Sequence, residues 1–139
     1  MSAQFPPDFY EWLRTHTRTG VKGGLVRPGF LEIWIVTVGQ RVFARSWDRS
    51  ARSWFTTFVA EGIGELRYGS QVIPVLGHQV PPGDPVQAEI HASYRARYTD
   101  PDALPYVTGI TQPEYEAYTL EFLPDAGREP YQTDDLPPP

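Results

Sequence analysis

Residues 30–38 restrict the possible folds of this chain more than any other segment. Their sequence, FLEIWIVTV, is largely β-branched or aromatic and is apolar on both faces, which is typical of a central strand. Gly39 and Gln40 follow, and glycine at the first central position favours a type II′ turn. Residues 41–47, RVFARSW, then return as a second strand. The sequence therefore predicts a β-hairpin at the centre of the sheet.

The return strand has two distinct faces, because successive side chains in a strand point to opposite sides. One face carries small or aliphatic residues and the other carries aromatic and basic residues. The first set is Val42, Ala44 and Ser46, and the second set is Phe43, Arg45 and Trp47.

Further strand signals favour a small antiparallel sheet. Residues 66–68 and 71–76 flank a Gly69-Ser70 turn, and residues 119–123 form a last strand. Pro74 lacks an N–H group, so its strand should lie at an edge or contain a bulge. Five or six short strands lose most of their exposed edges when the sheet closes into a barrel. An open sheet packed by two helices is the alternative.

Two to three helices are expected around this sheet, which gives an α+β fold. Residues 7–16 form an amphipathic helix, and Asp48 or Ser50 can cap a helix that runs to about Ala60. A third helix starts at Asp84, where Gln87 completes a capping box. We expect a long polar loop after it. Residues 1–124 then form one domain, and the acidic, proline-rich residues 125–139 form a mobile tail.

Composition excludes several classes of protein. The 139 residues fit one domain, and the absence of cysteine excludes a disulfide, a thiolate nucleophile and a cysteine-ligated zinc. The N-terminus lacks the pattern of a secretory signal, and no stretch approaches the ~20 apolar residues of a membrane span. We therefore expect a cytoplasmic protein with no membrane partner. A net charge of -5 disfavours nucleic-acid binding.

Positive charge is concentrated in one part of the chain. Residues 14–52 contain eight basic and two acidic residues, a net charge of +6, and the rest of the chain carries -11. A basic segment in an acidic protein can hold a small anion. The alternative is a solvated face of arginines, since surface charge is common.

Several motifs, taken in order, resemble a bacterial family known as domain of unknown function 2255. They are a W-x-V strand, a tight hairpin, a V-R-S-x strand, a helix that starts with W-F, and an A-Y-R-x-K/R-Y helix. Here they read LEIWIVTVGQRVFARSWDRSARSWFTTFVAEG, ELRYGSQVIPVLGHQV, HASYRARY and TLEFLP. The resemblance covers about residues 9–123.

That family is similar in layout to the flavin-binding split barrels, which include pyridoxamine-phosphate-oxidase-like proteins and deazaflavin-dependent nitroreductases. The resemblance implies a split β-barrel, a homodimer, and a ligand groove near the dimer interface. It also implies a flavin mononucleotide or deazaflavin cofactor, whose phosphate such relatives bind with a GR-x-SG-type loop. The corresponding stretch here, TRTGVKGG, keeps a glycine and Lys22 but not the full motif.

Candidate binding residues follow from the chemistry of a phosphorylated ring. Phosphate oxygens are bound by cations, hydroxyls and free backbone N–H groups, and aromatic faces stack on planar ligands. The candidates for cofactor binding are Lys22, Arg45, Ser46, Trp47 and Arg49. The candidates for substrate binding are Trp34, Arg97 and Tyr106. For each of them the alternative is an ordinary core or surface role.

Candidate catalytic residues are those that can transfer a proton: Tyr94, Tyr98, His78 and His91. No two histidines share the i, i+4 spacing of a helical metal pair, so no metal site is expected. Three hypotheses about function remain open. The chain is a flavin- or deazaflavin-dependent oxidoreductase, a cofactor-free enzyme or binding protein for a small apolar or aromatic metabolite, or a non-catalytic dimeric interaction module.

Overall fold

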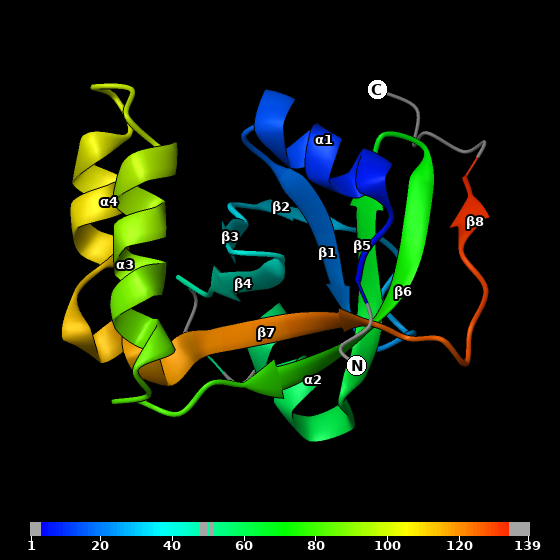
Figure 1. Cartoon of the computed structure of the whole chain (residues 1–139). Coiled ribbons are helices and arrows are strands. Elements are labelled where there is room, and N and C mark those ends of the chain that lie inside the picture. The colour runs from blue at the N-terminus through cyan, green and yellow to red at the C-terminus, as the bar shows by residue number, and fades with distance from the viewer. Residues whose placement is uncertain (1–3, 48–49, 51, 134–139) are drawn as a thin grey trace.

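We examined a computed structural model of the chain, which describes residues 4–47, 50 and 52–133. The helices are α1 (Pro7–Thr15), α2 (Trp54–Glu61), α3 (Val86–Arg97), α4 (Leu104–Ile110) and the 3-10 helix η1 (Pro113–Tyr118). The strands are β1 (Thr19–Gly23), β2 (Leu31–Ile33), β3 (Val36–Val38), β4 (Arg41–Arg45), β5 (Ile63–Tyr68), β6 (Gln71–Gln79), β7 (Thr119–Pro124) and β8 (Tyr131–Gln132). Figure 1 shows their arrangement.

The strands form one curled antiparallel sheet. Its order is β2-β1-β5-β6-β7-β4-β3, and β8 pairs with β6. β2 and β3 therefore lie at opposite ends of the order, yet only Trp34 and Ile35 separate them in sequence. Three peptide units span at most about 11 Å, so the two edges must approach each other. The sheet is thus a half-barrel, and we call the Trp34–Ile35 crossing between its two unpaired edges the seam.

The α+β class and the antiparallel curled sheet are confirmed, but the expected five to six strands are too few, because the described residues form a sheet of eight strands. Residues 30–38 do not form one strand, since the chain changes edges at Trp34 and Ile35. The glycine-rich stretch at 17–29, whose composition allows a loop or an irregular first strand, contains the strand β1. A Cβ at Gly23 would lie 2.6 Å from the Trp54 carbonyl oxygen, so glycine lets β1 approach the start of α2.

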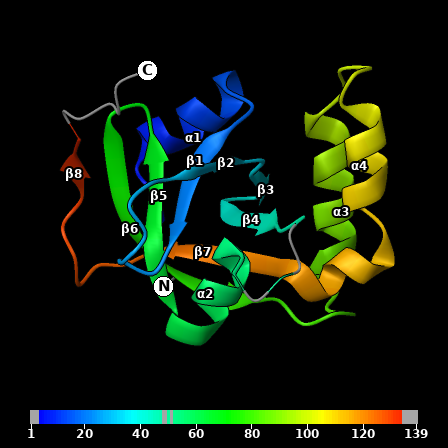
Figure 2. The same cartoon turned by 180° about the vertical axis from the view of Figure 1, so that it is seen from behind.

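Two apolar layers hold the fold together. The interior of the barrel contains Phe9, Val42, Phe58, Leu66 and Phe122 among others. The second layer packs α3 and α4 against the outside of β3 and β4, with Phe43, Ile90 and Tyr94 in it. α1 and α2 lie at opposite ends of the barrel, and the α3–α4 pair stands at its side (Figure 2). The expected split of the β4 faces is confirmed, because Val42 and Ala44 face the barrel while Phe43 faces the helices.

Both predicted hairpins are present with glycine in the expected place. Gly39 and Gly69 have φ of 62°, and each stands at the first central position of its turn. Pro74 lies in β6 opposite Glu65 of β5. On the other side of β6 it falls between the ends of two partners, since β7 pairs from Val75 onward and β8 pairs up to Val72. The missing N–H of Pro74 therefore leaves no ladder position unfilled.

Two helix predictions need correction. α2 starts at Trp54 with Ser53 as its cap, because the Ser53 hydroxyl accepts a hydrogen bond from the Thr56 N–H at 3.1 Å; the expected cap Asp48 lies outside the described residues. The expected long polar loop before β7 contains α4 and η1. The spacing of Leu104, Val107 and Ile110 places apolar residues on one face of α4, and Val107 and Ile110 are buried against α3 and its neighbours.

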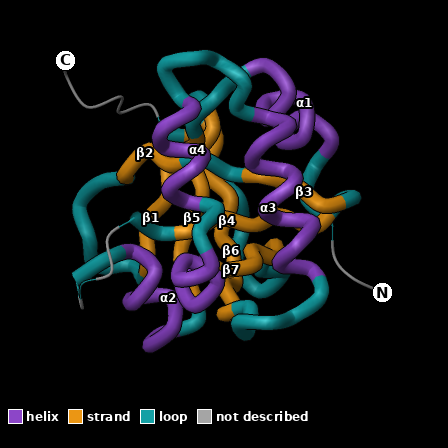
Figure 3. The backbone as a smooth tube through the Cα atoms, turned by 90° about the vertical axis from the view of Figure 1, so that its left-hand side faces the viewer, coloured by secondary structure: helices purple, strands orange, loops and turns teal. Residues whose placement is uncertain are grey.

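Part of the segment expected to form a mobile tail packs on the sheet. Tyr131 and Gln132 pair with β6, and Arg128 donates hydrogen bonds to the carbonyls of Gly64 and Val75 at 2.9 and 3.2 Å. Figure 3 shows how the helices gather round the strands when the molecule is viewed from the α3–α4 side. Among the residues described, no helix is long and apolar enough to cross a membrane.

Candidate functional site

A cavity of about 420 Å³ opens where the half-barrel fails to close. We call it the seam cavity. Its walls come from β2 and the seam, from the end of β4, and from the first residues of α2 and the inner side of α4. The lining residues are Arg18, Leu31, Glu32, Ile33, Trp34, Arg45, Ser46, Trp47, Trp54, Tyr106 and Ile110. The seam cavity is therefore lined mainly by apolar and aromatic side chains.

One wall of the seam cavity has a fixed orientation. The Trp34 indole stacks on the Tyr98 ring with 4.0 Å between centroids and an interplanar angle of 11°. The buried Tyr98 hydroxyl lies 3.1 Å from the Thr17 carbonyl oxygen and 3.2 Å from that of Ile35, and donates to this pair. Burial raises the pKa of Tyr98, so its hydroxyl stays protonated as this donor. Tyr98 therefore fixes the plane of Trp34.

Two exposed aromatic side chains, Trp47 and Tyr106, also line the cavity. Trp47 and Tyr106 are 45% and 59% exposed, and their rings meet edge to face at 6.2 Å. The Trp47 ring also lies edge to face with the Tyr115 ring, with 5.2 Å between the ring centroids. Gly109 permits this position, because a Cβ there would lie 2.7 Å from the Trp47 ring. Large exposed aromatic side chains at the mouth of a cavity are suited to covering a bound ring.

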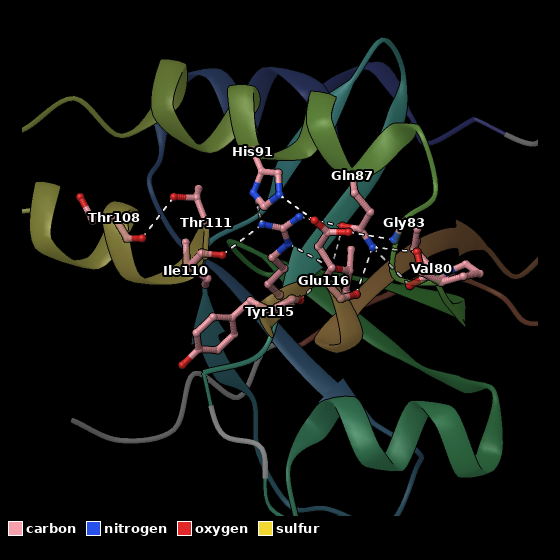
Figure 4. A network of polar contacts seen from close by, with 12 residues as sticks. Val80, Gly83, Gln87, His91, Thr108, Ile110, Thr111, Tyr115 and Glu116 are labelled. Carbon is pink, nitrogen blue, oxygen red and sulfur yellow. Dashed lines mark hydrogen bonds and ion pairs between the residues drawn. The ribbon is translucent and has the colours of Figure 1, made fainter. Parts of the chain in front are cut away.

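A buried polar network lies behind the cavity, between β4, α3, α4 and β7 (Figure 4). Arg45 is 2% exposed and is at its centre. Its Nε donates to Thr119 Oγ1 at 3.0 Å, its Nη1 to the Ile110 carbonyl at 3.0 Å, and its Nη2 to Gln87 Oε1 at 2.7 Å. No described carboxylate pairs with it directly. The hydrogen-bond partners of this buried guanidinium are therefore neutral acceptors. Burial of a charged group costs free energy unless such hydrogen bonds are made.

His91 connects Arg45 to a carboxylate. Its Nδ1 lies 2.8 Å from Arg45 Nη1, and its Nε2 lies 3.2 Å from Glu116 Oε2. Arginine can only donate, so Nδ1 must accept and the neutral ring carries its proton on Nε2, facing Glu116. Burial lowers the pKa of His91, and the nearby Arg45 charge lowers it further. His91 is therefore held neutral at pH 7.

Gln87 completes the network from the same face of α3. Its Oε1 accepts from Arg45 and from Thr119 Oγ1, and its Nε2 donates to the carbonyls of Val80, Pro81 and Glu116. The Gln87 half of the expected capping box is thus wrong, because this side chain points into the protein, whereas Asp84 does cap the helix start, since its Oδ1 accepts a hydrogen bond from the Val86 N–H at 2.9 Å. Among the described residues no group of three potential metal ligands is present.

Comparison with known proteins assigns the chain to a family. Residues 23–122 match the model of a family described as an uncharacterized protein conserved in bacteria, DUF2255. The chain belongs to this family. The match covers the whole Arg45 network and every residue that lines the seam cavity except Arg18. No curated protein matches the chain.

Two solved structures have a similar fold. The conserved hypothetical protein Rv2991 from Mycobacterium tuberculosis has a TM-score of 0.57 and 11% identity, over 93% of this chain and 84% of that one. HutZ, the heme storage protein from Vibrio cholerae, has a TM-score of 0.48 and 8% identity, over 93% and 94% of the chains. At 11% identity the likeness to Rv2991 shows a similar fold and nothing more. It agrees with a split-barrel layout for this DUF2255 chain.

The structure brings five of the expected site residues together at the seam cavity: Trp34, Arg45, Ser46, Trp47 and Tyr106. Arg49 lies outside the described residues. Arg18, Leu31 and Ile110 also line the cavity although the sequence did not single them out. Nothing in their spacing points to the cavity, because they come together only when the sheet curls.

The other candidates lie elsewhere. Lys22 pairs with Glu65 at 2.9 Å between β1 and β5. The fully buried Tyr94 accepts a hydrogen bond from the Arg45 N–H at 2.9 Å, and burial raises its pKa. His78 is exposed on β6, opposite Glu121 of β7. Arg97 and Tyr98 bond to each other beside the loop that follows α1.

Proposed function

We propose that this DUF2255 chain binds a planar aromatic small molecule in the seam cavity. The observation that carries the proposal is that two indoles line this cavity, one held by stacking on Tyr98 and one 45% exposed. A ring that contacts Trp34 and Trp47 in this cavity gains stacking and apolar contact. The cavity volume of about 420 Å³ is in the range of small-molecule sites.

The polar groups of the cavity limit the chemistry of the ligand. Arg18 is exposed at the mouth, and its guanidinium makes no hydrogen bond or ion pair with the described residues. Glu32 faces the same space with the opposite charge. These two groups favour a ligand whose polar edge both donates and accepts hydrogen bonds, as a heteroaromatic ring system with carbonyl and N–H groups does.

The tricyclic ring of a flavin or deazaflavin has such an edge, and the family resemblance supports it as the ligand. The phosphate of the cofactor fits less well. Lys22 is ion-paired away from the cavity, the N–H of Gly24 donates to the Ile63 carbonyl, and four Arg45 N–H groups are already bonded. We therefore propose that the ring, and not the phosphate, supplies most of the binding.

An oxidoreductase role would follow from such a ligand. A bound flavin or deazaflavin supplies the hydride chemistry, and the protein orients the ring and excludes water from one face. If flavins do not bind but uncharged aromatic compounds do, the alternative of a cofactor-free protein for an aromatic metabolite replaces the redox proposal.

Titration with riboflavin, flavin mononucleotide and a deazaflavin tests the proposal, with quenching of tryptophan fluorescence as the signal. We expect saturable quenching and similar affinities for riboflavin and flavin mononucleotide. Naphthalene derivatives serve as simple aromatic probes. Absence of saturable binding by all these compounds would contradict the proposed function.

α4 offers a matched pair of variants for the same titration. Tyr106 and Leu104 are exposed to similar extents, 59% and 51%, but only Tyr106 lines the cavity. Tyr106→Ala should weaken ring binding roughly three- to tenfold, the range of one aromatic contact. Leu104→Ala should leave the affinity unchanged. Equal effects of the two substitutions would place the ligand elsewhere.

We also propose the homodimer that the resemblance implies. β2 is a free edge strand, and Leu31 on it is 59% exposed beside Trp47 and Tyr106. The unpaired N–H and C=O groups of such an edge can pair with another chain. Sedimentation should give a dimer, and Leu31→Glu should shift it to a monomer; a wild-type protein that is monomeric at high concentration would refute the dimer.

A further inference from the structure

A second concave surface lies away from the seam cavity. Hollows of about 490 and 400 Å³ adjoin between α1, α3 and the β3–β4 hairpin. Both are lined by Arg14, Thr37 and Arg97, so they form one continuous depression, which we call the basic groove. None of its lining residues lines the seam cavity. Figure 3 shows α1, α3 and β3 on the same side of the molecule.

Arg97 is held in this groove by hydrogen bonds that use only part of its N–H groups. Its Nε donates to the Tyr98 hydroxyl at 2.9 Å, and its Nη2 donates to the His16 carbonyl at 2.6 Å. Its guanidinium also lies over the Tyr98 ring, 5.3 Å from the centroid. Nη1 makes no hydrogen bond to the described residues, and none of their carboxylates pairs with Arg97. The groove therefore holds an oriented cation whose charge is not neutralised.

The edge of β3 adds a backbone donor. Thr37 O accepts a hydrogen bond from Ser93 Oγ at 2.9 Å, so this carbonyl points out of the sheet toward α3. The N–H and C=O of one residue in an antiparallel strand point to the same side. The Thr37 N–H therefore also faces the groove. Among the strands that the structure describes, none pairs with β3 on that side, because β3 ends the strand order.

Arg14 supplies a second cation that can change partners. Its side chain is 66% exposed and pairs with Glu11 one turn earlier on α1. An exposed ion pair of this kind contributes little to stability. A ligand anion can therefore compete with Glu11 for the Arg14 guanidinium without disturbing the fold.

We propose that the basic groove binds a small molecule through a carboxylate or phosphate group. Arg97 and Arg14 donate to its oxygens, as guanidinium groups do with both kinds of anion. The Thr37 N–H supplies a further donor at the groove floor. The carboxylate and the phosphate make the same contacts here, so the site is defined by an oxyanion that faces two guanidinium groups.

This site can be tested by NMR titration of the ¹⁵N-labelled full chain at constant ionic strength. Inorganic phosphate and succinate are titrated separately. We expect saturable shifts of the amide signals of Thr37, Ser93 and Arg97, and the anion with the lower dissociation constant identifies the preferred group. Trp47→Ala should leave these shifts unchanged, so failure of the seam-cavity proposal would not affect this test.

Two exposed positions on α1 give opposite expectations. Arg14→Gln should weaken binding roughly threefold, and Glu11→Gln should strengthen it by a similar factor because the competing carboxylate is gone. Arg95→Gln, an equal change of charge on the exposed face of α3, should have no such effect. Arg97→Gln also removes its bonds to Tyr98 and His16, so it is compared with Arg97→Lys, which keeps the charge. Shifts that never saturate, or Arg14→Gln and Glu11→Gln variants that titrate like the wild type, would overturn the proposal.

Discussion

At the scale of single residues, Arg45 determines the state of its neighbours. A buried guanidinium surrounded by neutral acceptors forces His91 to accept at Nδ1 and excludes a second positive charge beside it. In the sequence, Arg45 and His91 are separate candidates, one for binding a phosphate and one for transferring a proton. The contact between them could not be predicted, because 46 positions separate them and only the packing of α3 on β4 brings them together.

The lowered pKa of His91 predicts how stability depends on pH. Since the folded protein disfavours the imidazolium, the unfolded chain binds the proton more readily. The contribution of neutral His91 to stability is fully present above the pKa of about 6.5 that histidine has in the unfolded chain. It is lost as the pH falls from there toward the lower pKa of His91 in the folded protein. Urea unfolding between pH 7.5 and 5 should show this loss, and His91→Gln should reduce it. The exposed His78→Gln serves as the control, and a wild-type dependence that persists in His91→Gln would contradict the assignment.

Gln87 gives a second prediction at this scale. Gln87→Leu keeps the volume but removes the acceptor of one Arg45 donor and the Gln87 donor to the carbonyls of Val80, Pro81 and Glu116, of which Pro81 keeps the Asp84 N–H. The cost should be about 3 kcal/mol in the free energy of unfolding, since a bond to a buried charge is lost. Gln112→Leu at an exposed position should cost less than about 0.5 kcal/mol. Equal urea midpoints for the two variants would show that the network contributes little.

At the scale of elements, the chain's local patterns predicted the two hairpins, α1, α3 and the two faces of β4. They failed where contacts between distant parts of the chain determine the secondary structure. The apolar run at 30–38 breaks at Trp34 because the chain changes edges there, and α4 is hidden in a stretch rich in proline and threonine. The seam cavity was therefore anticipated as a set of aromatic and basic residues, whereas its position between two sheet edges was not.

The packing of α4 on the cavity rim can be tested through Gly109. Its φ is not positive, so alanine is compatible with the backbone and favours the helix. The added Cβ would lie 2.7 Å from the Trp47 ring, so Trp47 must move. Gly109→Ala should therefore change the free energy of unfolding by less than about 1 kcal/mol and weaken ring binding on the order of tenfold. Unchanged affinity for riboflavin would remove Trp47 from the proposed site.

At the scale of the whole molecule, the barrel is closed on one side by pairing and left open at the seam. The C-terminal segment strengthens the paired side, because Arg128 bonds to Gly64 of β5 and Val75 of β6 while Tyr131 bonds to Glu65. Arg128→Ala should lower the free energy of unfolding by about 1–2 kcal/mol in urea. The exposed Arg95→Ala provides the comparison, and no difference between them would show that this segment does not support the barrel.

The central claim is that the open seam is the ligand site, and the four indole N–H signals in a ¹H–¹⁵N correlation spectrum test it most directly. Trp34, Trp47 and Trp54 line the cavity, whereas Trp12 stacks on His16 at 3.4 Å and does not line it. During titration with riboflavin, or with a naphthalene probe if no flavin binds, we predict that three signals shift along one saturation curve and that the Trp12 signal stays in place. A saturable shift confined to Trp12, or a ligand that binds without moving Trp34 and Trp47, would contradict the account.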